Sequence, residues 1–278
     1  MTHDTLFHIK TTLDYEQTVY CQIHLVSSNN NFMSETFFHF KQFTVHQDKC
    51  AMKVGTDAVL LGSWVKADKA LQILDIGTGS GVIALMIAQK SNAQIDAIDV
   101  DENAFQQSLE NFKNSRWPIR LNSKHKSLQN YSIEYTGKYD LIITNPPYFH
   151  HASKPAIESR LNARHSDLLT FDELLDGVKK LLNPDGQFYV ILPCKEGLEF
   201  LDKAQRKELF CHHLLRIKTK ADKNEKRLIM KFGFQLDKLK EEEIIIQEDD
   251  GSFTQEYIDL TYDYYIQLKQ TPSVFQQS

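Results

Sequence analysis

The sequence predicts an α/β protein with a mostly parallel sheet that carries helices on both faces. Three observations support this class. Between residues 71 and 193, short apolar runs alternate with longer amphipathic ones, which is the pattern of a parallel sheet covered by helices. A glycine-rich stretch follows the first run, and a proline pair follows the run at 139–144. With 278 residues, 41% of them hydrophobic, the chain is long enough to bury a large core.

The expected elements follow one another along the chain. Strands are expected at 71–77, 93–100, 139–145 and 186–193, and helices at 81–91, 102–115 and 170–182. Farther on, we expect a helix at 204–214 and an amphipathic final helix within 257–268. The apolar runs 227–235 and 241–248 are expected to complete the same sheet.

Composition limits the setting and the partners. The formal net charge of −5 argues against a protein that coats nucleic acid nonspecifically. The four cysteines include no CxxC pair, so we expect neither a disulfide framework nor a metal site. The longest apolar runs are too short for a membrane span, and the polar first residues lack the core of a signal peptide. A cytoplasmic, monomeric protein that binds no membrane is expected.

Two interpretations stay open for the first 32 residues. The stretch 18–26 looks like a strand, which would make a β-rich extension. Alternatively, the polar run 27–31 precedes Met33, which would be the true start. We favour Met33 and expect one domain over 33–278. Its parts are an N-terminal segment (33–70), a core that carries the binding and catalytic residues (71–193) and a part that completes the sheet (194–278).

A glycine loop joins the first strand to the first helix and reads Asp-Ile-Gly-Thr-Gly-Ser-Gly over 75–81. Glycines let the backbone turn tightly and let a ligand approach its amides, so Gly77, Gly79 and Gly81 predict a nucleotide-like ligand. The third glycine falls one residue too early for the GxGxxG of dinucleotide enzymes. Asp75 would repel a pyrophosphate but suits a cationic ligand, either directly or through a water, such as the amino-acid end of S-adenosylmethionine.

Asp99 ends the second strand, where a carboxylate can accept hydrogen bonds from both hydroxyls of a ribose. We therefore assign it to the same cofactor. Asp101 and Glu102 follow at the start of the next helix. Acidic side chains there interact favourably with the helix dipole, so we interpret both as helix charges.

The loop after the run at 139–144 reads Asn145-Pro146-Pro147-Tyr148. Together with the glycine loop, it makes the chain resemble the Rossmann-like, class I S-adenosylmethionine-dependent methyltransferases that carry an (Asn/Asp)-Pro-Pro-(Tyr/Phe) loop. That resemblance implies a seven-stranded sheet and methyl transfer to an amino or amide nitrogen on a planar π system. It implies that the Asn145 side chain and the Pro146 carbonyl hold the nitrogen, that Pro147 keeps the loop stiff, and that Tyr148 stacks on the base.

A closer resemblance rests on "KQFTVHQDKCAMKVGTDAVLLG", "LDIGTGSGVIALMIAQ", "YDLIITNPPYF", "ARHSDLL" and "YIDLTYDYY". These stretches are similar to the bacterial adenine-N6 methyltransferases that modify the adenine next to the anticodon of a valine tRNA. The resemblance implies a role beside the methionine end of the cofactor for Lys53, Thr56 and Asp57, although Thr56 or Asp57 could instead cap a helix. Where family members often carry an acidic residue that binds the cofactor's adenine, this chain departs from the pattern and offers Ser127, which can accept the same hydrogen bond more weakly. The resemblance implies that Arg160, Arg164 and His165 contact tRNA phosphates or cap the pocket, although surface salt bridges are an alternative for each.

Other functions stay open at this point. A glutamine methyltransferase of a translation release factor shares the Asn-Pro-Pro-Tyr chemistry, but usually carries a sizeable helical N-terminal domain. Another RNA or DNA amino-methyltransferase is a second alternative, and an RNA-binding protein that has lost its cofactor is a third. The intact Asp75, glycine loop and Asn145 argue against the last. The segment 216–231 is locally basic and, together with Lys41, Lys49, Lys124 and Lys126, could form an RNA-facing surface; a solvated lysine-rich loop is the alternative.

Overall fold

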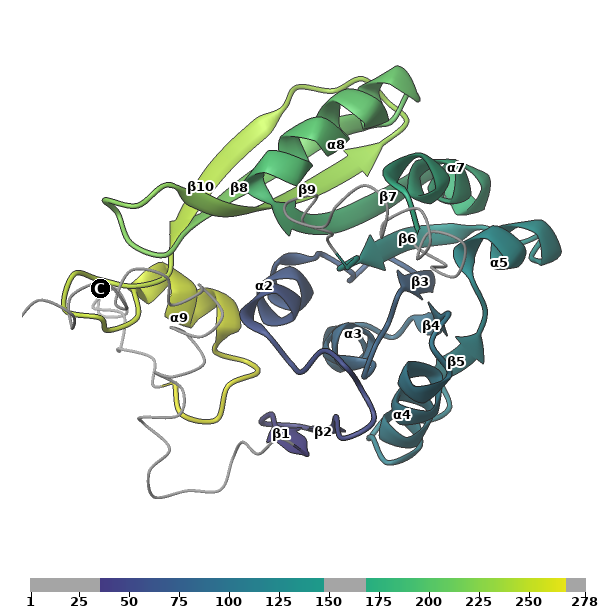
Figure 1. The fold of residues 1–278 in the computed structure, drawn as a ribbon, viewed down its shortest axis with the longest axis horizontal. Helices are drawn as coiled ribbons and strands as arrows, with labels where there is room; N and C mark the ends of the chain where they lie inside the picture. The colour runs from purple at the N-terminus through teal and green to yellow at the C-terminus, as the bar shows by residue number, and fades with distance from the viewer. Residues whose placement is uncertain (1–35, 148–168, 269–278) are drawn as a thin grey trace, which may run out of the picture.

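A sheet of eight strands runs through the residues that the computed structural model describes, 36–147 and 169–268 (Figure 1). The strand order is β10-β8-β9-β7-β6-β3-β4-β5. β9 is antiparallel to both β7 and β8, and the other neighbours are parallel. The strands are β3 (Gln72–Ile76), β4 (Gln94–Asp99), β5 (Leu121–His125), β6 (Tyr139–Thr144), β7 (Leu182–Pro193), β8 (Phe210–Lys218), β9 (Glu225–Gly233) and β10 (Lys240–Ile245).

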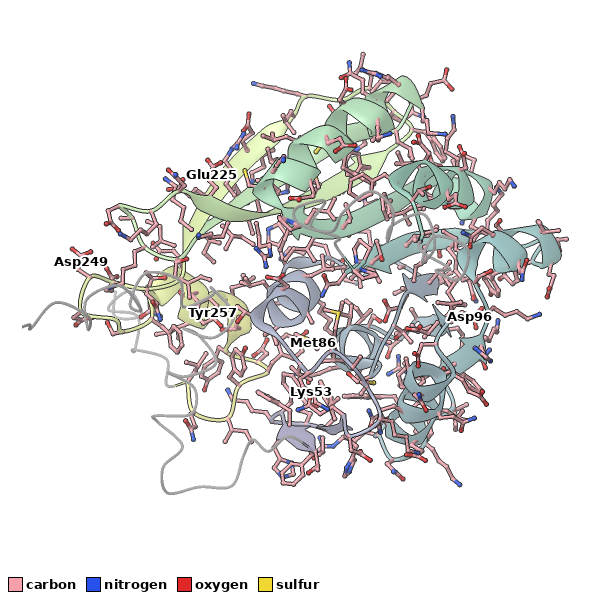
Figure 2. All side chains as sticks on the ribbon, viewed as in Figure 1. Lys53, Met86, Asp96, Glu225, Asp249 and Tyr257 are labelled. Atoms are coloured by element: carbon pink, nitrogen blue, oxygen red, sulfur yellow. The ribbon has the colours of Figure 1, made fainter. Side chains whose placement is uncertain are left out.

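Both faces of the sheet are buried, which explains why the central strands are almost wholly apolar. Successive side chains of a strand point to opposite faces, so Leu141 and Ile143 of β6 enter one core while Ile142 enters the other. The first core also contains Met86 and Tyr257, both fully buried (Figure 2). The two cores hold the sheet between two layers of helices.

Helices form these two layers. One face carries α2 (Thr56–Trp64), α3 (Val82–Lys90), α4 (Glu102–Lys113) and α9 (Gln255–Thr261), and the other carries α5 (Leu128–Glu134), α7 (Phe171–Leu181) and α8 (Cys194–Arg206) (Figure 1). Within the described residues, no helix combines the length and the apolar character that crossing a membrane requires. The α/β class and the mostly parallel sheet predicted from the sequence are confirmed.

The N-terminal segment forms a separate small hairpin, β1 (Phe37–His39) with β2 (Thr44–His46), and then α2. Asn111 of α4 fixes this hairpin, because its side chain accepts a hydrogen bond from the His46 amide at 2.9 Å and donates one to the His46 carbonyl at 2.7 Å. The same amide group donates to the carbonyl of Ser80 at 2.8 Å. The hairpin and the glycine loop are therefore held by one residue.

Two expectations need correction. The sheet has eight strands and not seven, and one of them, β8, begins within a segment that was expected to be helical. The helix expected at 204–214 is wrong: α8 ends at Arg206 and β8 begins at Phe210. The chain turns between them at Glu208, whose φ of 60° is in the left-handed region. The runs 227–235 and 241–248 do contribute strands to the same sheet, as expected.

Candidate active site

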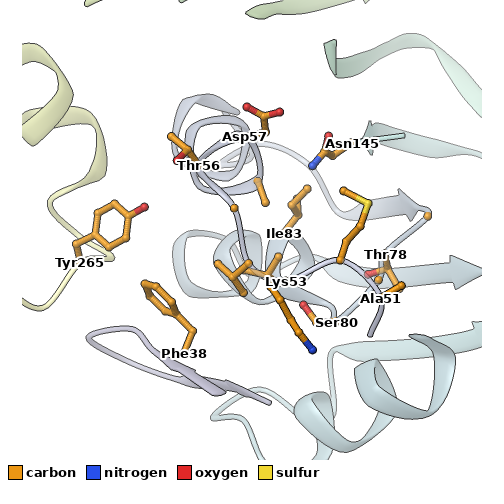
Figure 3. A pocket seen from close by; sticks show the side chains of 17 residues that line it. Phe38, Ala51, Lys53, Thr56, Asp57, Thr78, Ser80, Ile83, Asn145 and Tyr265 are labelled. Carbon is orange, nitrogen blue, oxygen red and sulfur yellow. The ribbon is translucent and has the colours of Figure 1, made fainter. Parts of the chain in front are cut away.

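A two-lobed cleft lies at the carboxyl ends of β3, β4 and β6, where ligands of parallel sheets bind. One lobe, the α2 lobe, has a volume of about 380 Å³ and is lined by residues 51–58 and by the glycine loop (Figure 3). The other, the β4 lobe, has about 370 Å³ and is lined by the ends of β4 and β6 and the start of α5. The two lobes share Ala51, Met52, Gly77, Gly79 and Asn145.

The neighbouring strand β4 supports the glycine loop. The amides of Gly77 and Thr78 donate to the carbonyl of Ile98 at 2.9 and 3.1 Å. Gly77 and Gly79 have φ of 68° and 56°, a conformation that glycine adopts without strain, and the position of a Cβ on either is open space. A ligand in the cleft can therefore approach the backbone of these two residues closely.

Gly81 serves packing instead of ligand approach. Its φ is 83°, and a Cβ added there would stand 2.5 Å from the ring of Phe112. Gly81 does not line either lobe, whereas Gly77 and Gly79 line both. The three predicted glycines thus divide into two at the cleft and one that lets α4 pack against α3.

Asp75 lies behind the loop and does not line the cleft. It is only 1% exposed, and its Oδ2 accepts a hydrogen bond from the Thr78 hydroxyl at 2.7 Å. Burial raises the pKa of this carboxyl to about 7, although the hydrogen bonds from Thr78 and the Ala84 amide oppose the shift. The structure therefore shows Asp75 as a support of the loop, and its assignment to the cofactor stays a prediction.

Asp99 lines the β4 lobe at the end of β4. Its Oδ2 accepts from the Gly79 amide at 2.8 Å, and its Oδ1 accepts from the Asp101 amide at 3.0 Å. Burial raises the pKa of this carboxyl, and hydrogen bonds from the backbone of Asp101, Gly79 and Val100 oppose the shift. Because two carboxylate oxygens together can accept about four hydrogen bonds, the group can still accept one from a hydroxyl group of a ligand.

Ser127 and Asp101 both begin helices beside this lobe. The Ser127 hydroxyl caps α5 by accepting from the Asn130 amide at 3.3 Å, and the residue lines the lobe. Asp101 caps α4 by accepting from the Ala104 amide at 2.9 Å. Asp101 therefore begins a helix as expected, and it also lines the β4 lobe.

The α2 lobe brings together the three residues that the resemblance assigns to the methionine end, Lys53, Thr56 and Asp57. The N-cap of α2 is Gly55, so neither Thr56 nor Asp57 is the cap. The Lys53 ammonium donates to the carbonyls of Gln47 and Cys50, at 2.8 and 3.2 Å, and thereby fixes the loop that carries it.

Asn145 and the first proline follow β6 directly. Thr144 ends that strand with a hydrogen bond from its hydroxyl to the Ile76 carbonyl at 2.8 Å, which fixes β6 against β3. Asn145 lines both lobes, and Pro146 and Pro147 line the β4 lobe. Tyr148, Arg160, Arg164 and His165 lie outside the described residues, as do residues 1–32.

Sequence reasoning missed three residues of the cleft wall. Met52 is 54% exposed and lines both lobes, and Phe38 and Tyr265 close the far side of the α2 lobe (Figure 3). The rings of Phe38 and Tyr265 are 6.1 Å apart although they come from opposite ends of the domain. Met52 and Tyr265 fall within or next to the stretches that carried the resemblance, but no spacing rule relates them to a ligand.

Several lysines considered for an RNA-facing surface are engaged with acidic groups. Lys49 pairs with Glu110, Lys124 with Asp96 and Lys126 with Glu134. In the segment 216–231, ion pairs involve Arg216, Lys218, Lys223 and Arg227. Part of its positive charge is therefore balanced by acidic side chains.

Comparisons with known proteins agree with this site. The family model "Methyltransferase small domain" matches residues 49–210. A protein of Bacteroides fragilis named tRNA1(Val) (adenine(37)-N6)-methyltransferase is 42% identical over 237 residues, which are 85% of this chain and all of that protein. A protein of Trichodesmium erythraeum with the same name is 42% identical over 82% of this chain and 97% of its own length.

A solved structure supports the fold alone. The predicted O-methyltransferase Atu636 of Agrobacterium tumefaciens superimposes with a TM-score of 0.59 at 17% identity, over 75% of this chain and 96% of that chain. The sequence relatives carry the finer assignment, because this chain covers them from end to end at above 40% identity. The chain belongs to the tRNA1(Val) (adenine(37)-N6)-methyltransferase family.

Proposed function

We propose that this protein transfers a methyl group from S-adenosylmethionine to the exocyclic N6 of adenine 37 in a valine tRNA, and that it does so in the cytoplasm. The observation that carries the proposal is the position of Asn145. This uncharged amide lies in the wall shared by the two lobes, and so it faces both the space for a cofactor and the approach to it. A group that orients an acceptor amine toward a methyl donor needs this position.

The cleft residues fit S-adenosylmethionine. Gly77 and Gly79 leave open space above the loop, which a bulky nucleoside needs. The Asp99 carboxylate lines the β4 lobe, where it can accept a hydrogen bond from a ribose hydroxyl, and the start of α5 provides the polar Ser127 in the same lobe. The α2 lobe offers the carboxylate of Asp57, which suits a cationic amino-acid end.

When bound, this cofactor supplies a methyl group on a positively charged sulfur, which is already activated. The protein's task is therefore to position the acceptor nitrogen, whose lone pair is delocalised into the adenine ring. The side-chain oxygen of Asn145 and the carbonyl oxygen of Pro146 can each accept one hydrogen of the amine. These bonds draw the nitrogen toward tetrahedral geometry and expose its lone pair. The methylated amine is acidic enough to lose its proton to water, so no general base is assigned.

The direct test is an incubation of the protein with S-adenosylmethionine and unmodified valine tRNA, followed by digestion and mass spectrometry of the nucleosides. We expect N6-methyladenosine with the intact protein and none with Asn145→Ala. If cofactor binding is confirmed by calorimetry and no N6-methyladenosine forms on this or other tRNAs, the proposal is wrong.

A glutamine methyltransferase of a release factor is not favoured. The relatives that this chain covers along their full length carry the tRNA name. The same assay distinguishes the two functions, because a release factor offered in place of tRNA would gain methylglutamine.

A further inference from the structure

Arg227 contacts a residue of the cleft wall, Asp57, although it lies outside the matched methyltransferase domain, residues 49–210. It is the third residue of β9, opposite Pro193 of β7 and Ile217 of β8. Pro193 is where β7 ends, so Arg227 stands at the same edge of the sheet as the cleft. From there its Nε donates to Oδ2 of Asp57 at 2.7 Å.

This ion pair is the most deeply buried within the described residues. The side chain of Arg227 is 14% exposed and that of Asp57 is 3% exposed, whereas every other pair there leaves at least 17% of each partner in water. A surface ion pair contributes little to stability, but a buried charge whose partner is removed is left in an unfavourable environment. Removal of Arg227 would therefore take the ionic partner away from a buried carboxylate.

Asp57 also faces the ligand space. It is the second residue of α2 and lines the α2 lobe. The helix α2 fixes the backbone of Asp57, and an acidic side chain in the first helical turn interacts favourably with the helix dipole. The Arg227 guanidinium holds one of its carboxylate oxygens. The carboxylate therefore presents a defined orientation to a ligand.

We infer that Arg227 is a positioning residue of this enzyme, acting through Asp57 on the amino-acid end of the methyl donor. The inference rests on the proposed function of the cleft. The planar guanidinium orients a carboxylate in a way that the point charge of a lysine does not, which explains an arginine at this position. Without it, the Asp57 carboxylate loses its orientation, and a misplacement of about 1 Å in a binding site is enough for a large loss.

The test measures the dissociation constant of S-adenosylmethionine by calorimetry, and kcat and KM with tRNA. The variants are Arg227→Met, Arg227→Lys, Asp57→Asn and the double variant Asp57→Asn/Arg227→Met. The matched control is Arg216→Met, which removes an arginine of β8 that pairs with Glu225 and Glu241 and does not line the cleft.

We expect Arg227→Met to raise the cofactor Kd by about tenfold or more while kcat at saturating cofactor stays near wild type. Arg227→Lys should keep more of the cofactor affinity than Arg227→Met does. In a protein that already carries Asp57→Asn, the further change Arg227→Met should raise the cofactor Kd only slightly. The control should keep the wild-type Kd.

Two results would overturn the inference: a folded Arg227→Met protein with the wild-type Kd, or losses that add in full in the double variant. If Arg227→Met fails to fold, Arg227→Gln removes the charge with less change in shape, and its Kd decides in the same way. Failure of the proposed function would appear separately, as a wild-type protein that binds the cofactor but makes no N6-methyladenosine.

Discussion

The Asp99 carboxylate joins the end of β4 to the glycine loop, because its Oδ2 accepts a hydrogen bond from the Gly79 amide at 2.8 Å. Its other oxygen accepts from the Asp101 amide, just before α4. One side chain thus shapes the loop and also faces the β4 lobe. Its removal should disturb the cofactor site in two ways at once.

Asp99→Ala should therefore weaken S-adenosylmethionine binding by at least about tenfold, since the loss combines hydrogen bonds to a charged group with a loosened loop. The base that is methylated should not change. Calorimetry with the cofactor measures this, and Asp202→Ala, an exposed acid of α8, is the control. An unchanged Kd would show that Asp99 does not hold the ribose.

Asn145→Ala should lower kcat for methyl transfer by about a hundredfold or more, while cofactor binding stays nearly intact. The reason is that the amide acts on the acceptor nitrogen. Single-turnover rates and cofactor Kd measured side by side separate the two effects. Asn114→Ala, at the exposed end of α4, is the control. A comparable loss of cofactor affinity would mean that the loop is structural.

Gly81→Ala and Gly79→Ala should differ in kind. At Gly81 the added methyl group would stand 2.5 Å from the Phe112 ring, and alanine would have to adopt a left-handed backbone conformation. We therefore expect a loss of roughly 2–4 kcal/mol in the free energy of unfolding. At Gly79 only the backbone conformation is unfavourable, and the methyl group stands at the cleft. Gly79→Ala should lose about 1 kcal/mol in the free energy of unfolding and bind the cofactor less well. Urea unfolding measures the stability of the two variants, and calorimetry measures their cofactor affinity. Equal losses of stability would contradict this prediction.

Asp75→Asn should change how stability depends on pH in the cofactor-free protein. The pKa of Asp75 is raised in the folded state from 3.8 to about 7, so its contribution to stability is present below pH 4 and is lost as pH rises to 7. The variant should therefore gain stability over wild type as pH rises through this window, by roughly a few kcal/mol at pH 8.

The buried Lys90 makes stability rise with pH, in the opposite direction to Asp75. Burial lowers the pKa of its ammonium to about 7, so its contribution to stability is lost as pH falls from 10.5 toward 7. Wild type and Asp75→Asn share this contribution, so it cancels when the stability of one is subtracted from that of the other. Thermal unfolding from pH 4 to pH 8 measures this difference. A difference that does not vary with pH would mean that Asp75 is ionised throughout.

The sequence predicted the central strands and the catalytic loop because each has a local signal. Ile73–Ile76 is an apolar run that ends at glycines, and the run that ends at Thr144 is closed by two prolines. The turn at Glu208 gave no such signal, since a left-handed turn there usually carries glycine or asparagine. The edge strand β10 begins with four charged residues, because an edge strand has one neighbour and an exposed side.

The site could be predicted only where its residues directly follow a strand. The glycines follow one strand end and Asn145 follows another, and a parallel sheet brings such ends together. That Asp75 is buried behind its loop depends on the packing of Thr78 and α3, which spacing does not reveal. The contact between Arg227 and Asp57 joins residues 170 positions apart and has no counterpart in any pattern.

The wall shared by the two lobes has a consequence for the order of events. Whatever fills one lobe completes the surface of the other, because Met52, Gly79 and Asn145 belong to both. A cofactor that occupies both lobes therefore also shapes the place where Asn145 would meet the acceptor. The occupancies of donor and acceptor should be thermodynamically linked, and the factor by which tRNA tightens the cofactor must equal the factor by which the cofactor tightens tRNA. An enzyme built this way would release its demethylated cofactor more readily once the modified tRNA has left.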